Sequence, residues 1–435
     1  MKNKNRTFTL GFALFSMFFG AGNLILPPFI GINSTSGWIY ALIGFSLTAV
    51  IAPFISLIAV GQVGNNFMDM GKRVNPKLIM ILAFITICLI GPVIGIPRTG
   101  ATTFEIGLRP IFPNISPNMA ALAFFTLNAS LSISPHKIID IIGKYLTPIL
   151  IILLLTLILI GIIFPSHVQH LPEVNTINLF ALGFHEGYQT MDILSAVIFA
   201  GIILKTMSEQ GELAPKQRLY TTIKAGLIAA LALFFIYAGL IYLGAISDYP
   251  LADHISRTTL LLYISTSILG PIGTYLIALT MTLACLTTAI ALTSAFASFM
   301  EKITKGKIGY KLNVILCSLL SAILSVKGVD EIISYAEILL GLIYPIVFAL
   351  VIYLVFLGKF VKAKAPYIAA VIVTSLVSSL SAFLYYFPHM PILGAIRNKL
   401  PFAEHNMDWL LPSFIAFIIS SLFSKNKDFL DSRPF

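Results

Sequence analysis

The feature that most limits the fold of this chain is a series of long apolar stretches without charge. Residues 145–165 run for 21 positions without one charged side chain. A helix needs about 20 apolar residues to cross the hydrocarbon core of a bilayer. Only 11% of all residues are charged and 57% are hydrophobic, whereas about a quarter of the residues of soluble domains are charged. The sequence therefore predicts an all-α polytopic membrane protein.

Twelve apolar segments divide the chain, and each is a predicted transmembrane helix. Every loop between them is short, so no separate soluble domain fits and residues 1–435 form a single transmembrane domain. The segments are 8–30, 38–60, 78–104, 118–134, 144–164, 179–204, 219–246, 265–299, 313–326, 333–357, 366–387 and 409–424.

Basic residues alternate between the loops. One predicted side of the membrane holds 22 of the 28 Lys and Arg residues, including Lys137 and Lys144 in one loop and Lys425 in the carboxyl-terminal tail. The positive-inside rule places that side, with both termini, in the cytoplasm, and we expect a bacterial inner-membrane protein. Because no basic patch forms, the net charge of +10 does not predict a nucleic-acid partner. The first apolar run is too long for a cleaved signal peptide.

The first segment contains a pattern that breaks helices. Gly20 and Gly22 permit non-helical backbone angles, Asn23 adds an amide, and two prolines follow at 27–28. Lipid tolerates a broken helix only where freed backbone groups find partners or line a cavity, so a break is a candidate binding site. A close helix contact or a simple kink would also explain the pattern.

A second polar cluster opens the sixth segment. Residues 183–192 bring His185, Glu186, Thr190 and Asp192 together at the start of an apolar run. Charged side chains within a membrane usually face a cavity or a partner. The alternative for Glu186 is a solvated position among the lipid headgroups.

The two breaks lie five segments apart. Five-helix repeats starting there would have opposite orientations, which is the inverted-repeat plan of many secondary transporters. This topology predicts repeat one at about 8–164, repeat two at about 179–357, and two additional helices at about 366–424.

The third segment places an arginine inside the membrane. Residues 91–100 contain three glycines and two prolines before and around Arg98, and Glu105 follows seven residues later. Arg98 needs a carboxylate, carbonyl groups or an aqueous space. An ion pair with Glu105 or Glu186 and a role in gating or substrate binding both remain open.

The eighth segment carries hydroxyl groups on one helical face. Ala284, Thr287 and Thr288 follow i, i+3, i+4 spacing. Their oxygens, together with backbone carbonyls, suit Na⁺. Serine and threonine in membrane helices also bond back to the preceding turn, which is the alternative explanation.

Four of these segments together resemble the branched-chain amino acid:cation symporter family. The matching stretches are Phe-Phe-Gly-Ala-Gly-Asn-Leu-Ile-Leu-Pro-Pro (18–28), Gly-Pro-Val-Ile-Gly-Ile-Pro-Arg-Thr-Gly (91–100), Glu-Gly-Tyr-Gln-Thr-Met-Asp (186–192) and Cys-Leu-Thr-Thr-Ala-Ile-Ala-Leu-Thr (285–293). They occur in family order over most of the chain. The resemblance implies the leucine-transporter fold of two inverted five-helix repeats plus two helices, within the amino acid–polyamine–organocation superfamily.

The resemblance also implies uptake of leucine, isoleucine and valine by symport with Na⁺ or H⁺, without an enzymatic reaction, another cofactor or an obligatory protein partner. Beyond the substrate, the lipid bilayer is the expected partner. The implied substrate-binding residues are Phe18, Gly20, Ala21, Gly22, Asn23, Glu186, Gly187, Tyr188 and Thr190. The implied Na⁺ ligands are Ser16, Phe19, Ala284, Thr287 and Thr288. Arg98, Glu105 and Asp192 are expected to be gating or structural charges, and Glu186 or Asp192 would carry a coupling proton.

Other functions are weaker alternatives. A carrier of the same fold for another amino acid or small solute would share most of these features. An ion channel is disfavoured because the sequence has no repeated filter motif. An intramembrane hydrolase or transferase is disfavoured because no nucleophile–base pattern occurs.

Overall fold

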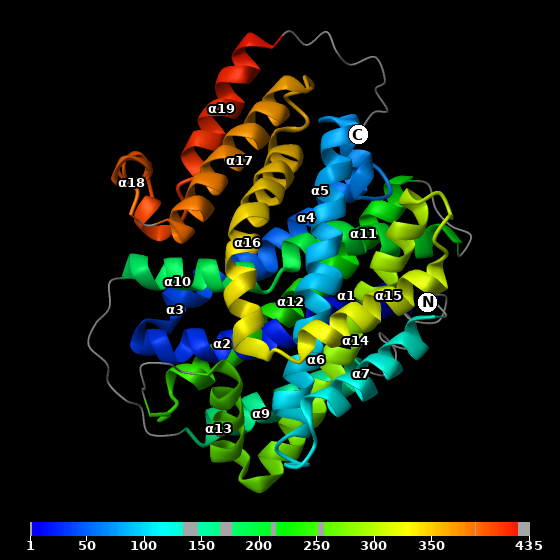
Figure 1. Ribbon diagram of the computed structural model, residues 1–435, viewed down its shortest axis with the longest axis vertical. Coiled ribbons are helices and arrows are strands. Elements are labelled where there is room, and N and C mark those ends of the chain that lie inside the picture. Colours follow the sequence, from blue (N-terminus) through cyan, green and yellow to red (C-terminus); the bar gives the residue numbers. More distant parts are fainter. Residues whose placement is uncertain are drawn as a thin grey trace. The chain divides into compact units, whose positions relative to one another are not determined.

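A computed structural model describes residues 2–133, 147–165, 176–209, 215–250, 256–387 and 389–424, and all regular structure in these ranges is helical (Figure 1). The predicted all-α class is confirmed. The loop with Lys137 and Lys144, the first residues of the segment 144–164, and the tail with Lys425 lie outside the described residues.

Each of the twelve predicted segments contains a helix. In chain order they are α1 (Lys2–Phe18) with α2 (Ala21–Ser34); α3 (Trp38–Ser46), η2 (Leu47–Ile51) and α4 (Ala52–Val63); α5 (Pro76–Cys88), η4 (Leu89–Val93), α6 (Gly95–Thr102) and η5 (Thr103–Leu108); α7 (Pro117–Ser132); α9 (Thr147–Ile163); α10 (Thr176–Gln189) with α11 (Asp192–Glu209); α12 (Pro215–Ala245); α14 (Pro271–Ile303); α15 (Tyr310–Ser325); α16 (Val329–Ile352) with η8 (Tyr353–Leu357); α17 (Ala365–Tyr386); and α19 (Leu410–Phe423). Two further helices, α13 (Arg257–Leu269) and α18 (Pro391–Asn398), lie between these.

The predicted segment 265–299 combined parts of two helices. Gly270, with a φ angle of 60°, separates α13 from α14. Only glycine adopts such angles readily, so the chain turns there and the eighth membrane helix begins at Pro271.

Six helical stretches in the described residues are long and apolar enough to cross a membrane, and α10 with α11 forms a seventh as a bent pair. The first stretch, Ala21–Val63, has 43 residues and a length of about 65 Å, roughly twice the hydrocarbon core. It therefore supplies parts of two spans, with a turn at Thr35, whose φ angle is 40°. Four shorter apolar helices belong to α1, α9, α15 and α19.

The chain divides into two compact units, each assembled from three stretches. Unit 1 contains Met1–Ile51, Ile87–Ser195 and Lys224–Tyr335, and unit 2 contains the rest. This division does not follow the two predicted repeats, whose boundaries stay a prediction. Every residue of the candidate site described below lies in unit 1.

Helix α14 is the centre of unit 1. It contacts α1, α6, α7, α9, α13 and α15, and its residues 284–297 are buried. Beside it, α2, α3 and α10 pack against one another (Figure 1). Glycines bring α3 and α10 together, since a Cβ atom at Gly44 would overlap the carbonyl oxygen of Phe180 and one at Gly183 would overlap that of Ala41.

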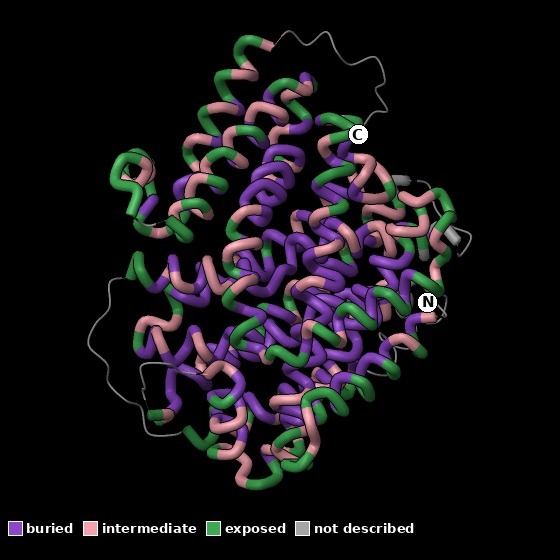
Figure 2. The backbone as a smooth tube through the Cα atoms, in the orientation of Figure 1, coloured by how far each residue is buried: buried purple, intermediate pink, exposed green. Residues whose placement is uncertain are grey.

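Large apolar side chains are exposed along the outer helices of unit 1. Leu122 on α7 is 70% exposed, Ile152 on α9 63% and Ile323 on α15 64%. Figure 2 shows such exposed positions, in green, recurring along these helices. Apolar surface of this extent is unfavourable in water but favourable against lipid.

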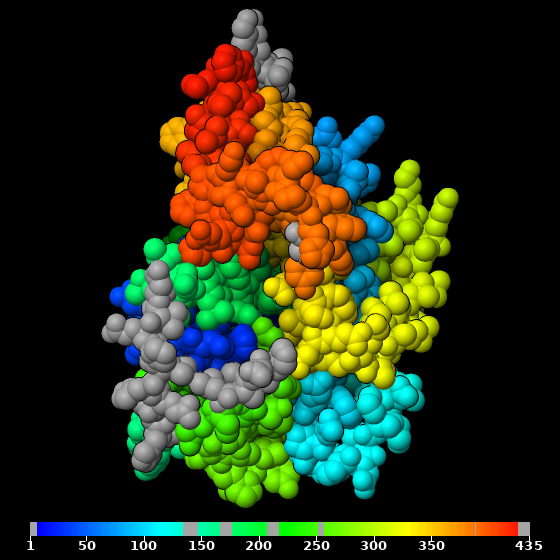
Figure 3. Space-filling model, turned by 60° about the vertical axis from the view of Figure 1, so that its left-hand side comes forward, coloured from blue at the N-terminus to red at the C-terminus, as the bar shows by residue number. Residues whose placement is uncertain are grey.

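In unit 2, α17 packs against α19, and the hydroxyls of Tyr353 and Thr374 both bond to Ser413 Oγ, at 3.0 and 2.8 Å. The short helix α18 has no buried residue, and the space-filling view shows its orange segment at the surface (Figure 3). Arg397 anchors this segment through an ion pair with Asp408 at 2.9 Å.

Candidate substrate and cation site

The first helix break lies between α1 and α2. Gly20 is extended, with φ −114° and ψ −160°, and α2 begins at Ala21. The break leaves the first N–H groups of α2 without helical acceptors. A Cβ atom at Gly20 would lie 3.0 Å from Thr288 Oγ1, so the missing side chain lets α14 approach the break. The break is shorter than the expected Gly20–Gly22, because Ala21 and Gly22 already belong to α2.

The second break lies between α10, which ends at Gln189, and α11, which begins at Asp192. Met191 has a φ angle of 61°, in the left-handed region that non-glycine residues seldom occupy. Thr190 stabilises the turn, because its Oγ1 donates to the Gly187 carbonyl at 2.7 Å and accepts from the Asp192 N–H at 3.4 Å.

Asn23 ties the two breaks together. Its Nδ2 donates to Asp192 Oδ2 at 2.7 Å and also to the Tyr237 hydroxyl on α12, and its Oδ1 accepts from the Gly20 N–H at 3.3 Å. Asn23, Asp192 and Tyr237 are all buried. A single amide therefore joins the first break to the second and to a third helix.

Arg98 reaches the same place from the third span. The span deforms at η4, where Gly91 has non-helical angles, and α6 then carries Arg98 inward with only 3% of its surface exposed. Its Nη1 donates to the Gln189 carbonyl at 2.7 Å, and its guanidinium lies against Gly22, where a Cβ atom would come within 2.7 Å of Nη2.

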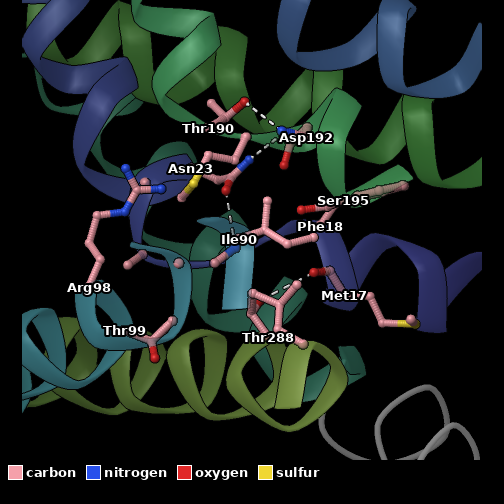
Figure 4. A pocket seen from close by; sticks show the side chains of 16 residues that line it. Met17, Phe18, Asn23, Ile90, Arg98, Thr99, Thr190, Asp192, Ser195 and Thr288 are labelled. Carbon is pink, nitrogen blue, oxygen red and sulfur yellow. Dashed lines mark hydrogen bonds between the residues drawn. The ribbon is translucent and has the colours of Figure 1, made fainter. Parts of the chain in front are cut away.

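These elements enclose one small cavity (Figure 4). Its volume of about 20 Å³ is enough for a water-sized molecule. Nine residues predicted from the sequence line it: Phe18, Gly20, Ala21, Gly22, Asn23, Arg98, Thr190, Asp192 and Thr288. The six predicted substrate residues among them lie together around the two breaks, and their role in binding stays a prediction.

Three predicted substrate residues lie elsewhere, since Glu186, Gly187 and Tyr188 do not line this cavity. Glu186 pairs with Arg257 at 2.8 Å, and Arg257 also lies over the Phe29 ring, 4.1 Å from its centroid. Gly187 lets α10 approach Thr48, whose Oγ1 a Cβ atom there would overlap. Tyr188 is buried against Phe184 and His185.

Neither ion pair considered for Arg98 forms. Glu186 belongs to Arg257, and Glu105 accepts the Val329 N–H at the start of α16 at 2.9 Å. The seven-residue spacing predicts a common face only for an α-helix, and Glu105 lies in η5, which is a π-helix. The wider turn of a π-helix shifts the residues that follow around the helix axis.

The predicted Na⁺ ligands converge beside the cavity. Thr287 Oγ1 lies 3.2 Å from the Ser16 carbonyl and 3.0 Å from that of Ala284, and Thr288 Oγ1 lies 3.4 Å from the Ser16 carbonyl. The Met17 carbonyl, which was not predicted, is also 3.4 Å from Thr288 Oγ1. The predicted ligand at Phe19 is its backbone carbonyl, and its role stays a prediction. The Phe19 ring stacks on Phe15 and Tyr237, and its N–H donates to the Phe15 carbonyl at 2.7 Å.

Sequence reasoning missed several cavity residues for which a signal existed. Ser195 follows Asp192 by three positions and Leu292 follows Thr288 by four, so helical spacing predicts both on the cavity side. No such signal marks Tyr237 or Arg257, which do not line the cavity but contact Asn23 and Glu186, respectively. The other cavity residues not predicted are Met17, Ile90, Gly95, Thr99 and Met191.

Known proteins resemble this chain, some in sequence and others in fold. The family model described as branched-chain amino acid transport protein matches residues 3–427. The branched-chain amino acid permease BraB of Bacillus subtilis is 32% identical over 420 residues, which cover 95% of this chain and 94% of the permease.

Two solved structures share the fold at low sequence identity. Mhp1, a nucleobase-cation-symport-1 family transporter, superposes with a TM-score of 0.64 at 13% identity, covering 96% of this chain and 91% of Mhp1. A Na⁺-coupled sialic acid symporter gives 0.59 at 15% identity, covering 96% and 90%. The predicted fold class, a polytopic leucine-transporter-like bundle, is thereby confirmed. With the family model matching almost the whole length, the chain belongs to the branched-chain amino acid transport protein family.

Proposed function

We propose that this protein imports leucine, isoleucine and valine by symport with Na⁺. The observation that carries the proposal is the convergence of two helix breaks on one buried polar cavity in a chain of this family. The protein would be a carrier and not an enzyme, because the solute crosses the membrane unchanged. It would work in the bacterial cytoplasmic membrane with both termini inside, needing neither nucleic acid nor a protein partner.

The cavity offers both kinds of contact that a branched-chain amino acid requires. Open N–H groups at the start of α2 suit the α-carboxylate, because a helix amino terminus attracts anions. Phe18, Ile90 and Leu292 provide apolar lining for the branched side chain. Since the cavity now fits only a water-sized molecule, its lining must move apart when substrate enters.

Na⁺ is the coupling ion that the oxygen cluster supports better. The Ser16 and Ala284 carbonyls and the Thr287 and Thr288 hydroxyls are uncharged hard oxygens, which hold a cation but do not exchange protons near neutral pH. These neutral oxygens would hold Na⁺ by coordination, without a carboxylate to balance its charge. A proton would require a carboxylate, and Asp192 is the candidate that lines the cavity.

Coupling between Na⁺ and substrate would arise because both bind at the first helix break. Thr288 approaches Gly20 on one side and the Ser16 and Met17 carbonyls on the other. A cation that orders these carbonyls also orders the break that would receive the substrate. Because such coupling is reciprocal, Na⁺ should tighten leucine binding and leucine should tighten Na⁺ binding by the same factor.

The test is leucine uptake into proteoliposomes with Na⁺ and pH gradients imposed separately. Thr288→Val keeps the shape of the side chain but removes one oxygen, so we expect the Na⁺ concentration for half-maximal uptake to rise roughly tenfold, about 1.4 kcal/mol of ion affinity. Thr288→Ser, the matched control, should behave like the wild type. If Thr288→Val has the same Na⁺ dependence as the wild type and a pH gradient drives its uptake, the proposed Na⁺ coupling is refuted in favour of H⁺ coupling.

A further inference from the structure

Two opposite charges face the cavity without pairing with each other. Arg98 and Asp192 both line it, with 3% and 1% of their surfaces exposed. Figure 4 shows them on opposite sides, with Asn23 between them. Among the residues that the structure describes, no ion pair joins the two. Isolated charges are costly inside a membrane protein, so both groups need a partner that these residues do not supply.

Arg98 has hydrogen-bonding capacity to spare on the side of the first break. A guanidinium has five N–H donors, and within the described part of the chain only Nη1 donates, to the Gln189 carbonyl. The guanidinium packs on Gly22, next to the open N–H groups of α2. A planar donor fork beside a helix amino terminus matches the two oxygens of a carboxylate.

Asp192 offers the complementary charge on the side of the second break. Its carboxylate accepts a hydrogen bond from Asn23 Nδ2 at 2.7 Å and lies close to the hydroxyls of Thr190 and Tyr237. These neighbours are uncharged. An ammonium group has three donors and a full positive charge, which makes it the natural remaining partner of a buried carboxylate.

We propose that Arg98 binds the α-carboxylate and Asp192 the α-ammonium of the substrate, so that the cavity selects zwitterionic amino acids. This assignment rests on the proposed function and adds its specificity-determining residues. The substrate lies between two charges that the protein holds apart, and both charges are neutralised only when the ligand carries both groups of the zwitterion. Arg98 and Asp192 are then substrate ligands, where the sequence had suggested gating or structural charges.

The proposal predicts a specific pattern of ligand rejection. Leucinamide keeps the ammonium but lacks the carboxylate, and 2-hydroxy-4-methylpentanoate keeps the carboxylate but lacks the ammonium. Each leaves one buried charge unpaired, so the wild type should bind either compound at least roughly tenfold more weakly than leucine. The branched side chain is the same in all three, so the difference reports the charged groups alone.

The experiment measures stabilisation of the purified full-length protein against heat by each of the three compounds at saturating Na⁺. In Arg98→Gln, the preference for leucine over leucinamide should fall to within about threefold, while the preference over the hydroxy acid persists. Asp192→Asn should show the mirror image. Arg257→Gln, which alters an arginine of the same unit away from the cavity, should keep the wild-type ranking. Arg98→Lys, which keeps the charge but loses the fork, serves if Arg98→Gln does not fold.

Two results would overturn the assignment. One is wild-type protein that binds leucinamide or the hydroxy acid as tightly as leucine. The other is an equal loss of all three compounds in each variant, which is the outcome for a purely structural pair of charges. A wild type that binds another amino acid and not leucine refutes the proposed substrate alone, and the same comparison with that amino acid, its amide and its hydroxy acid still decides the charge assignment. A wild type that binds no amino acid refutes both.

Discussion

Replacing Asn23 by alanine should lower the free energy of unfolding more than the loss of any other side-chain amide on α2. The change removes the bonds to Asp192 at 2.7 Å, to Tyr237 and to the Gly20 N–H at 3.3 Å. A hydrogen bond to a charged group contributes about 1.5–3 kcal/mol and a neutral one about 0.5–1.5 kcal/mol. Counting the first bond as charged, the second as neutral and the long third as negligible, we expect a loss of about 3 kcal/mol.

Denaturant titration of the purified protein in detergent micelles, without substrate, measures this free energy. Asn33→Ala is the matched control, because Asn33 is on the same helix and makes one local bond, to the Phe29 carbonyl at 2.7 Å. That variant should lose at most about 1 kcal/mol. Adding Asp192→Ala to Asn23→Ala should cost less than the sum of the single changes, because no carboxylate is then left without its donor. Equal losses of unfolding free energy for the two asparagine variants, or strictly additive losses in the double variant, would refute the proposed link between the two breaks through Asn23.

Three further outcomes are expected. Glu186→Gln should lower the apparent Tm, and adding Arg257→Gln should cost less than the sum because the pair is only 12–18% exposed; additivity in this cycle would show that the ion pair contributes nothing. Gly22→Ala should reduce leucine affinity, since its methyl meets Arg98, whereas Gly20→Ala should raise the Na⁺ requirement, since its methyl meets Thr288; binding assays in which either change leaves both quantities unaltered would contradict the site. A cytoplasm-only reporter should be active when fused at Lys72 or Lys362 and silent at Ser34 or Ser247, and a reversed pattern at two sites would end the twelve-span topology.

Local features of the site could be predicted because they follow from the chemistry of neighbouring residues. Glycines at 20 and 22 mark a place where a membrane helix can break, and the spacing of Ala284, Thr287 and Thr288 fixes their common face whatever surrounds it. Helix positions were predictable for the same reason, since long apolar runs have few alternatives to membrane helices.

Partners across the fold could not be predicted, because they depend on packing between distant helices. Glu186 finds Arg257, 71 positions later, and Asn23 finds Tyr237, 214 positions later. A tyrosine in an apolar run looks the same whether it faces lipid or accepts a buried bond. The π-helical turn at η5 could not be predicted either, because the sequence around Glu105 shows no mark of an extra residue in the turn. The α-helical spacing between Arg98 and Glu105 therefore suggested an ion pair that does not form.

The glycine-mediated contact between α3 and α10 limits which parts of unit 1 can move. Backbone meets backbone at Gly44 and Gly183, with no flexible side chain between them. Two helices fitted this closely have little freedom to slide or tilt, so they behave as one stiff plate. Opening of the cavity to a substrate should therefore change the backbone at the second break, around Met191, and leave the packing of α3 on α10 unchanged.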